Sequence, residues 1–273
     1  MDHPILHAPW RYAAEPFEIA DRVFYVGNTW VGSYLLDTGG GLILIDSGVA
    51  QSVYLLLENI RKLGFDPRQI KKILLTHGHF DHAGGAEMIR RYTGAQVYLG
   101  KEDWFIVDKR PELLLAGQDA CPLFEKDAWY REGEPIRLGD VSILPVHTPG
   151  HTPGTWSFFF QATWQGGVYT CGMHGGLGFN TLHDAYFEQT GLPRSLREEY
   201  LRSLEKLRGI HVDIHLGSHP ETARMLEKAA GRKAGQNPFI DPEEWNRFLD
   251  AKRRQFLDTF AATAHDETKE RNL

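Results

Sequence analysis

Four side chains that can bind a metal ion lie within six positions of the segment ILLTHGHFDHAGG. They are His77, His79, Asp81 and His82, and three glycines in the segment free the backbone for a sharp turn. Imidazoles together with a carboxylate suit Zn²⁺, whereas Mg²⁺ and Ca²⁺ prefer oxygen ligands alone. The spacing therefore predicts half of a two-metal hydrolytic site, with zinc as the metal.

Two metal ions need about six protein ligands, so others must come from elsewhere in the chain. In HTPGHTPGTWSF, His147 and His151 flank a Pro-Gly turn, and their positions do not choose between them. In GSHPETA, His219 follows a strand-like segment, and sites in α/β sheets usually lie at such strand ends. His215, within that segment, is expected to be a core residue. His174, in GMHGGLG, fits a substrate contact and simple exposure equally well.

Strand-like and helix-like segments alternate along the chain, which predicts an α/β architecture. Strands are expected at 22–27, 33–38, 42–48, 71–76, 96–100, 141–146, 155–161, 167–171 and 211–217, and helices at 51–63, 86–92, 101–108, 195–208, 221–230 and 243–262. Ser195 and Glu198 fit a capping box. Residues 109–134 carry few periodic cues, which predicts a long, mobile loop beside the site. No low-complexity linker divides the chain, so residues 1–273 are expected to form a single domain.

Composition narrows the classes of partner. The 273 residues carry a net charge of −6 with acidic and basic residues interspersed, so a nucleic-acid partner is not expected. The expected partner is a small-molecule substrate. Neither a membrane-spanning segment nor a signal sequence is recognisable. A cytoplasmic location is expected, or a periplasmic one if a signal peptide has been removed. Cys121 and Cys171 are too few for a disulfide framework, and the oligomeric state cannot be read from the sequence.

The chain resembles the metallo-β-lactamase superfamily, in which HGHFDH, a TPGHT segment and a later strand-end histidine occur in this order. It is most similar to the third subclass of the class B β-lactamases. The start APWRYAAEPFEIADRVFYVG, the run NIRKLGFDPRQIKKILLTHGHFDHAGG, and GSHP followed by NPFIDPEEW all look like that group. The resemblance covers nearly the whole chain and implies a four-layer αββα sandwich.

The resemblance also implies a ligand set for two zinc ions, with His147 in a supporting role. One ion would be bound by His77, His79 and His151, and the other by Asp81, His82 and His219. Most other hydrolases of the superfamily bridge their metals with an aspartate where this chain has Gly172 or Met173. The missing carboxylate argues against glyoxalase-type and typical lactonase-type sites.

The loop after that position departs from the subclass. Met173 stands where the subclass often has a serine that helps to hold the substrate carboxylate, so Met173 and His174 are candidate substrate contacts. Cys171 could bind zinc as in another subclass, but a buried thiol is expected instead. Asp46, at the end of LILID, could accept a hydrogen bond from a ligand imidazole or simply form a turn.

The implied activity is a zinc-dependent β-lactamase reaction of the kind that gives antibiotic resistance. A hydroxide held between the two zinc ions would open the amide bond of the β-lactam ring, and Asp81 would orient it as well as bind metal. The alternative is a hydrolase of lactones or other small cyclic esters and amides with the same dizinc site. A protein that binds a ligand without catalysis is a third possibility. The loops at 109–134 and 173–194 are expected to set the specificity.

Overall fold

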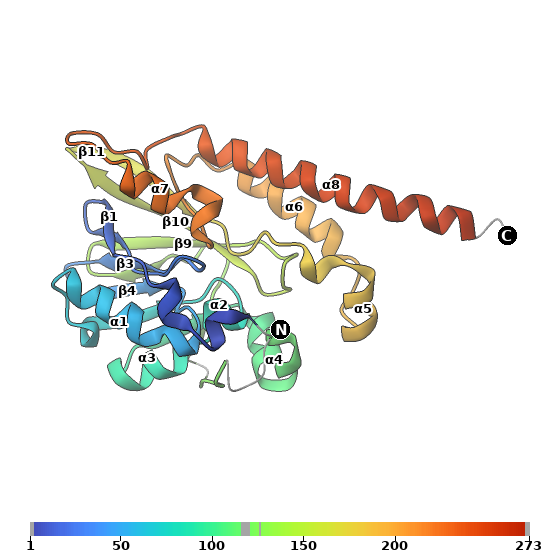
Figure 1. Cartoon of the computed structure of the whole chain (residues 1–273), viewed down its shortest axis with the longest axis horizontal. Coiled ribbons are helices and arrows are strands. Elements are labelled where there is room, and N and C mark those ends of the chain that lie inside the picture. Colours follow the sequence, from blue (N-terminus) through green and yellow to red (C-terminus); the bar gives the residue numbers. More distant parts are fainter. Residues whose placement is uncertain (1–2, 116–120, 126, 271–273) are drawn as a thin grey trace.

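Two β-sheets face each other in the centre of the molecule, and helices cover the outer face of each sheet (Figure 1). The computed structural model describes residues 3–115, 121–125 and 127–270, with side chains as far as residue 261. The arrangement confirms the α/β class and the αββα sandwich that the family resemblance implied.

The first sheet contains seven strands in sequence order. They are β1 (Phe17–Ala20), β2 (Val23–Tyr25), β3 (Tyr34–Asp37), β4 (Leu42–Ile45), β5 (Ile70–Leu74), β6 (Gln96–Leu99) and β7 (Ala128–Trp129). The pairs from β1 to β4 are antiparallel, and those from β4 to β7 are parallel. The carboxyl ends of β4, β5 and β6 therefore meet at one edge of the sheet.

The second sheet has the order β12-β11-β10-β9-β8. Its strands are β8 (Ile136–Leu138), β9 (Val141–His147), β10 (Trp156–Trp164), β11 (Gly167–Met173) and β12 (Ile214–Leu216). All pairs are antiparallel except β11 with β12, which is parallel. β12 consequently ends beside the end of β11, and the loops that follow both strands emerge on the same side.

The strand β4 shows how alternation builds the layers. Successive side chains of a strand point to opposite faces of the sheet. Ile43 and Ile45 pack between the two sheets, whereas Leu42 and Leu44 pack under the helices. All four are buried, which explains why LILI is uniformly apolar instead of alternating with polar residues.

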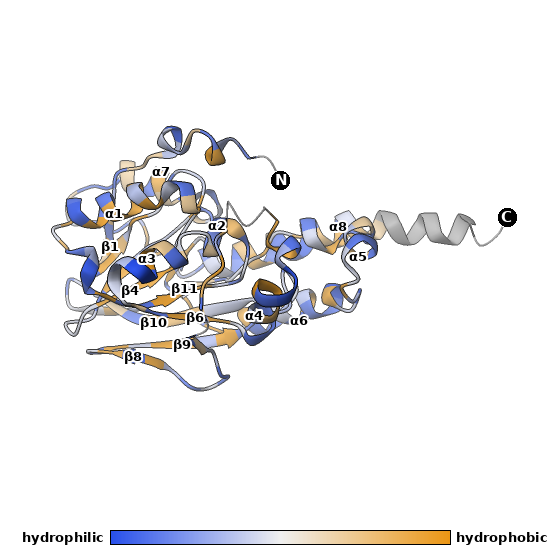
Figure 2. Cartoon of the chain, turned by 90° about the horizontal axis from the view of Figure 1, so that it is seen from below, coloured by the Kyte–Doolittle hydropathy of each residue, from blue (hydrophilic) through white to orange (hydrophobic). Residues whose placement is uncertain are grey.

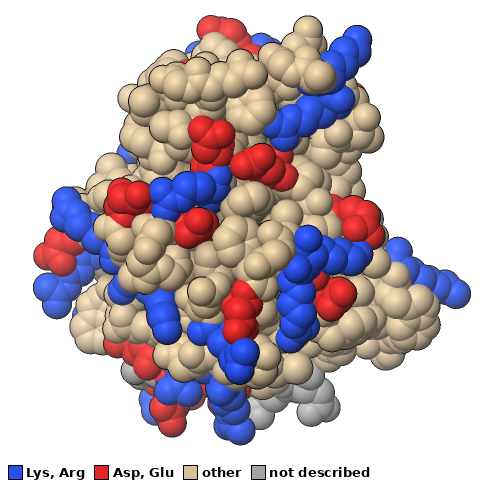
Figure 3. All heavy atoms as spheres, turned by 90° about the vertical axis from the view of Figure 1, so that its left-hand side faces the viewer, with Lys and Arg blue, Asp and Glu red and all other residues tan. Residues whose placement is uncertain are grey.

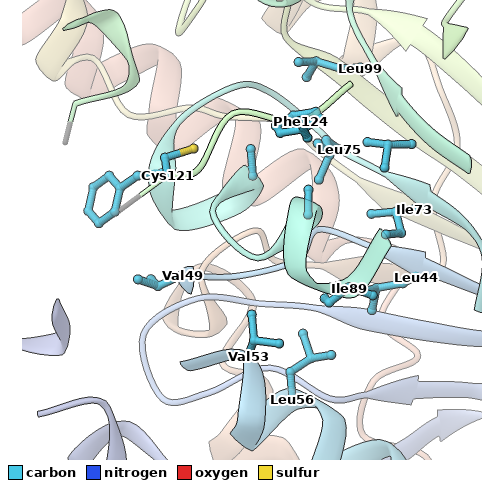
Figure 4. Packing of buried hydrophobic residues seen from close by; sticks show 14 of the residues in the cluster. Leu44, Val49, Val53, Leu56, Ile73, Leu75, Ile89, Leu99, Cys121 and Phe124 are labelled. Atoms are coloured by element: carbon cyan, nitrogen blue, oxygen red, sulfur yellow. The ribbon is translucent and has the colours of Figure 1, made fainter. Parts of the chain in front are cut away.

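Four helices lie on the side of the first sheet: α1 (Val53–Lys62), α2 (Phe80–Ala83), α3 (Ala86–Thr93) and α4 (Lys101–Lys109). Figure 4 shows Val53 and Leu56 of α1 and Ile89 of α3 pointing toward Leu44 and Ile73 of the sheet. Val53, Leu56 and Ile60 of α1 are buried, and their spacing of three or four residues forms one apolar helix face.

The outer face of the second sheet is covered by α6 (Leu196–Arg208) and α8 (Glu244–Glu270), which lie side by side (Figure 1). The indole of Trp245 in α8 donates a hydrogen bond to the Leu207 carbonyl of α6 at 3.0 Å. In Figure 2 the strands of both sheets are largely hydrophobic, whereas the helices carry both hydrophilic and hydrophobic residues. Two shorter helices, α5 (Asp184–Thr190) and α7 (Met225–Ala230), complete this half.

Several local predictions are wrong. Ser195 already has helical backbone angles and makes no side-chain cap; its hydroxyl instead donates to Glu199 at 3.3 Å. The helix expected at 221–230 is divided by Arg224, whose φ of 49° is left-handed, into a 3₁₀-helix (Pro220–Ala223) and α7. Strand β1 was not anticipated.

The segment 109–134 is more structured than predicted where the structure describes it. It contains a 3₁₀-helix at Pro111–Leu114 and the strand β7, while residues 116–120 and 126 lie outside the described residues. The face seen in Figure 3 carries acidic and basic side chains next to one another, without a continuous basic stripe. Among the described helices, none has the length and apolar character needed to cross a membrane.

Candidate metal centre

The first histidine motif is placed where a strand ends and a short helix begins. β5 ends at Leu74, and His77 follows on the loop at its carboxyl end. His79 directly precedes α2 with an extended backbone, at φ −67° and ψ 150°, and Asp81 and His82 lie within α2. The change from extended to helical backbone gathers the four side chains around one point.

Two groups of side chains bring their ligand atoms close enough to share a metal ion. In the first cluster, ligand atoms of His77, His79 and His151 lie within 4.8 Å of one another. Here the Nδ1 atom of His79 faces the Nε2 atom of His151 at 3.0 Å. In the second cluster, His77, Asp81 and His82 meet the same limit. Because the clusters share one imidazole, two metal ions bound there would be close neighbours.

His219 adjoins the second cluster. It follows β12 and the short segment Gly217–Ser218, and its Nε2 atom lies 3.5 Å from Oδ2 of Asp81. The Nε2 atom of His82 lies 3.4 Å from the same oxygen. The structure thus gathers into one site all six side chains that the family resemblance singled out.

Hydrogen bonds fix the orientation of four of these imidazoles through the ring nitrogen that points away from the centre. The pairs are His77 Nδ1 with Thr76 Oγ1 (3.0 Å), His82 Nδ1 with Asp46 Oδ2 (2.8 Å), His151 Nδ1 with the Gly178 carbonyl oxygen (2.6 Å) and His219 Nδ1 with the Trp30 carbonyl oxygen (2.7 Å). An imidazole that donates through Nδ1 presents the lone pair of Nε2, as metal-binding histidines usually do.

The donor set fits a metal ion. The Nε2 atom of His77 is buried and has no hydrogen-bond partner among the described residues. A buried orphaned nitrogen is costly unless an ion or water satisfies it. A site with five imidazoles and one carboxylate matches the nitrogen-rich preference of zinc more than the oxygen preference of magnesium or calcium. The geometry and chemistry therefore agree on a metal centre with two His/Asp clusters.

Asp46 links the ends of β4 and β5 to the second cluster. Its carboxylate accepts hydrogen bonds from the Thr76 backbone N–H at 2.7 Å, the Thr76 hydroxyl at 2.9 Å and Nδ1 of His82 at 2.8 Å. Its own φ is 55°, a left-handed conformation that is unusual for a residue other than glycine. Of the two roles left open by the sequence, the structure shows the hydrogen bond to a ligand imidazole, because the Asp46 carboxylate orients His82.

The second cluster favours a bound cation. Burial lowers the pKa of His82, but attraction by Asp81 and Asp46 outweighs burial and raises it to about 10. Burial raises the pKa of Asp81, but His82 more than compensates and holds it well below its ordinary value. The negative charge of Asp81 and Asp46, which favours a proton on His82, would also favour a metal cation bound in place of that proton. In the first cluster, burial lowers the pKa of His77 and His79, so both are neutral ligands at neutral pH.

Asp103 joins the two loops that supply the first cluster, one with His77 and His79 and the other with His151. It lies in the first turn of α4 and is fully buried. Its carboxylate accepts hydrogen bonds from Gly78 N–H at 2.8 Å, the Thr152 hydroxyl at 2.8 Å and Gly154 N–H at 2.7 Å. Burial raises its pKa to about 6, although these hydrogen bonds oppose the shift. This role could not be predicted from the sequence, because an acidic residue in the first turn of a helix is common.

A cavity of about 280 Å³ opens over the six side chains. Trp30, Phe80 and Leu115 supply apolar walls, and Asn180 and Lys252 supply polar groups. The cavity is thus large enough for a small molecule beside the metal ligands.

The remaining candidates lie away from the metal ligands or at the cavity wall. His147 hydrogen-bonds through Nε2 to the Pro153 carbonyl at 3.1 Å and belongs to neither cluster. His215 is buried against Trp245, as the core interpretation predicted. His174 is only 1% exposed and lines the cavity, so the alternative of simple exposure is wrong.

The end of β11 corrects one prediction. Met173 is 0% exposed and packs in the core between the sheets, opposite Phe158, and it does not line the cavity. Its expected contact with substrate is therefore not supported by its position. Cys171, two residues earlier on the same face, is a buried free thiol in the same core, as expected. Burial raises its pKa, which opposes formation of a metal-binding thiolate.

The loop after β11 passes so close to His151 that a side chain at Gly176 would overlap the imidazole ring. We expect Gly176→Ala to displace this ring and to lower both the zinc content and kcat/KM, the latter by about 100-fold. Gly178→Ala is the matched control, because its Cβ would meet Asn180 at 3.2 Å and the His151 ring only at 3.5 Å. Equal zinc content and kcat/KM for the two variants would contradict the prediction.

Comparison with known proteins identifies the family. Residues 31–219 match the metallo-beta-lactamase superfamily, and this range contains all six clustered side chains. A subclass B3 metallo-beta-lactamase of Bradyrhizobium japonicum superposes with a TM-score of 0.84 at 29% identity, over 96% of this chain and 99% of the other.

Two curated relatives have other named activities. The hydroxyacylglutathione hydrolase of Haemophilus influenzae is 28% identical over 68% of this chain and 82% of its own length. An N-acyl homoserine lactonase of Bacillus thuringiensis is 26% identical over 52% of this chain and 62% of its own length. The sequence match, the shared fold and the clustered ligands agree: this chain belongs to the metallo-beta-lactamase superfamily.

Proposed function

We propose that the protein is a dizinc hydrolase that opens the amide bond of β-lactam rings. The observation that carries the proposal is the six-residue site, in which hydrogen bonds to Nδ1 orient ligand imidazoles such as His82 and His219. The chain that holds this site superposes on a subclass B3 β-lactamase over almost its whole length. One zinc ion would be held by His77, His79 and His151. The other would be held by Asp81, His82 and His219.

When bound, the zinc ions supply a water of lowered pKa and Lewis-acid polarisation of the scissile carbonyl. The chain's own groups prepare this chemistry. Asp46 holds the His82 ring in the orientation that frees Nε2, and the Gly178 and Trp30 carbonyls do the same for His151 and His219. Asp81, which faces His82 and His219, would also accept a hydrogen bond from the attacking water and orient it.

The described cavity favours hydrolysis without a bridging aspartate. Its only carboxylates among the described residues are those of Asp81 and Glu221, and the end of β11 carries Gly172 and Met173. This pattern supports the β-lactamase interpretation over glyoxalase-type chemistry. A lactonase or related hydrolase of small cyclic esters is the second candidate, supported by the similarity to an N-acyl homoserine lactonase.

The test compares substrates under controlled metal loading. Zinc-loaded protein is assayed with a cephalosporin, a carbapenem, an N-acyl homoserine lactone and a hydroxyacylglutathione. We expect β-lactam hydrolysis with kcat/KM of about 10⁴ M⁻¹s⁻¹ or more, loss of activity with a chelator, and recovery with zinc. Lactone or thioester turnover with little β-lactam cleavage would reject the proposed substrate but keep the metallo-hydrolase.

A further inference from the structure

Two neighbouring imidazoles in the second half of the chain are buried without a polar partner. His174 follows the end of β11, His215 lies in β12, and each is 1% exposed. Their ring centroids are 5.5 Å apart. None of the four ring nitrogens of this histidine pair forms a hydrogen bond within the part of the chain that the structure describes. Buried polar atoms in proteins are nearly always hydrogen-bonded, so four such nitrogens in one place require an explanation.

Aromatic rings enclose the histidine pair. Trp245 and Phe248 of α8 pack against both imidazoles, and the indole N–H of Trp245 is directed to the Leu207 carbonyl instead. A protonated imidazole has two N–H donors, and the enclosing rings offer no oxygen to accept from them. Cation–π contacts would offset only part of the cost. A proton on either imidazole would therefore create a buried charge without a hydrogen-bond acceptor.

The charged groups around His174 also oppose its protonation. Lys252 acts on it from α8, and His82 and His219 act on it from the metal centre. Burial has the largest effect, and together with these groups and His215 it holds the pKa of His174 well below its ordinary value. Zinc bound at the second cluster would add further positive charge nearby.

His215 has a similar environment on its other side. Lys228 of α7 acts on it, and Lys228 itself forms an ion pair with Glu244. Burial is again the main cause, and it lowers the pKa of His215 to about 3. Among the described residues, no carboxylate accepts a hydrogen bond from either imidazole of the pair. Both imidazoles are therefore neutral at pH 7.

The histidine pair lies between two segments that supply metal ligands. His215 belongs to β12, which leads to His219 four residues later. His174 begins the loop whose Gly178 carbonyl accepts the hydrogen bond from Nδ1 of His151 at 2.6 Å. Separation of this loop from β12 would therefore disturb one ligand histidine in each half of the metal centre.

We propose that the histidine pair is an acid-sensitive contact: while His174 and His215 are neutral they hold the loop after β11 against β12, and protonation of either opens this region and releases zinc. The charged imidazole would gain hydrogen bonds to water only after opening. Because the pKa of both groups is lower in the folded than in the unfolded protein, the unfolded protein binds protons more readily. Stability is therefore full above about pH 6.5, the ordinary histidine value, and is lost as the pH falls below it.

The first arm of the test measures stability. Urea unfolding of protein freed of metal is compared at pH 7 and pH 5. An imidazole that stays neutral when folded should raise the unfolding constant about 25-fold over this interval. We therefore expect the increase to be about 25-fold smaller in His215→Leu and in His174→Leu than in wild type, and about 600-fold smaller in the double variant.

His211→Leu is the matched control for this arm. His211 lies just before β12, but it is exposed and hydrogen-bonds to Asp213 at 2.9 Å. We expect its unfolding constant to change with pH as in wild type, within about threefold. The same pH dependence in wild type and in both leucine variants of the histidine pair would overturn the proposal.

The second arm measures zinc release into an excess of a fluorescent chelator. At pH 5, zinc-loaded His215→Leu is expected to release zinc about 10-fold more slowly than wild type and His211→Leu, whereas the three rates should agree at pH 7. Equal rates at pH 5 would contradict the link between the histidine pair and the metal centre. Neither arm uses a substrate, so a failure of the proposed β-lactamase activity would leave this inference standing.

Discussion

Replacing His151 by alanine is expected to remove one bound zinc ion and to lower kcat/KM by about 10³-fold or more. The Nε2 atom of His151 lies 3.0 Å from Nδ1 of His79, and without it the first cluster keeps only His77 and His79. Two imidazoles fall short of the three protein ligands that catalytic zinc sites use. Zinc content by elemental analysis and steady-state kinetics, measured on the same samples, would check both expectations.

His147→Ala is the control for that experiment. This histidine lies four residues earlier, at the end of β9, and shares the Pro-Gly turn, but it bonds to the Pro153 carbonyl and not to either cluster. We expect the His147→Ala protein to keep two zinc ions and most of its activity. Full activity in His151→Ala, or metal loss in His147→Ala with His151 intact, would mean that the ligands are assigned wrongly.

The comparison of these two histidines also shows what a sequence can predict. His77, His79, Asp81 and His82 were recognisable because they are neighbours on one loop, and their spacing is itself the signal. The choice between His147 and His151 depends on which side of the turn faces a loop from the other sheet. Only the family resemblance favoured His151, and the packing of two distant segments explains why.

The end of β11 shows how a strand can be predicted correctly while the cavity contact expected of one of its residues, Met173, is not found. The strand was expected at about its true place, but its side chains alternate between the core and the opposite face. Cys171 and Met173 share the core face, and His174 follows the strand end and reaches the cavity. A shift of one residue therefore decides whether a side chain lines the cavity or packs in the sheet core.

Residues that act across the fold left no trace in the sequence pattern. Asp103 lies in the first turn of α4, where acidic residues are favoured by the helix dipole. Its role depends on which distant segments pack against the side chain, and local periodicity carries no information on that point.

Asp103→Ala is expected to lower the free energy of unfolding by about 3–5 kcal/mol and to weaken zinc binding as well. Without the carboxylate, the N–H groups of Gly78 and Gly154 and the hydroxyl of Thr152 lose their acceptor in a buried place. Gly78 lies between His77 and His79, and Thr152 follows His151, so the loss would loosen both loops that supply the first cluster. Urea unfolding of the chelated protein would measure stability, and zinc titration would measure affinity.

Two further variants distinguish the hydrogen bonds of Asp103 to the two ligand loops from an ordinary helix-dipole effect. Glu102→Ala removes the neighbouring acidic residue from the same helix turn, and we expect a stability change within about 0.5 kcal/mol and unchanged zinc affinity, because Glu102 is exposed. Asp103→Asn keeps the shape of the side chain but turns an amide N–H₂ toward one of the three donors, so it should lose stability and zinc affinity between wild type and Asp103→Ala. If Glu102→Ala and Asp103→Ala had the same small effect, Asp103 would contribute only its charge at the helix start, and the ligand loops would be held by their other contacts.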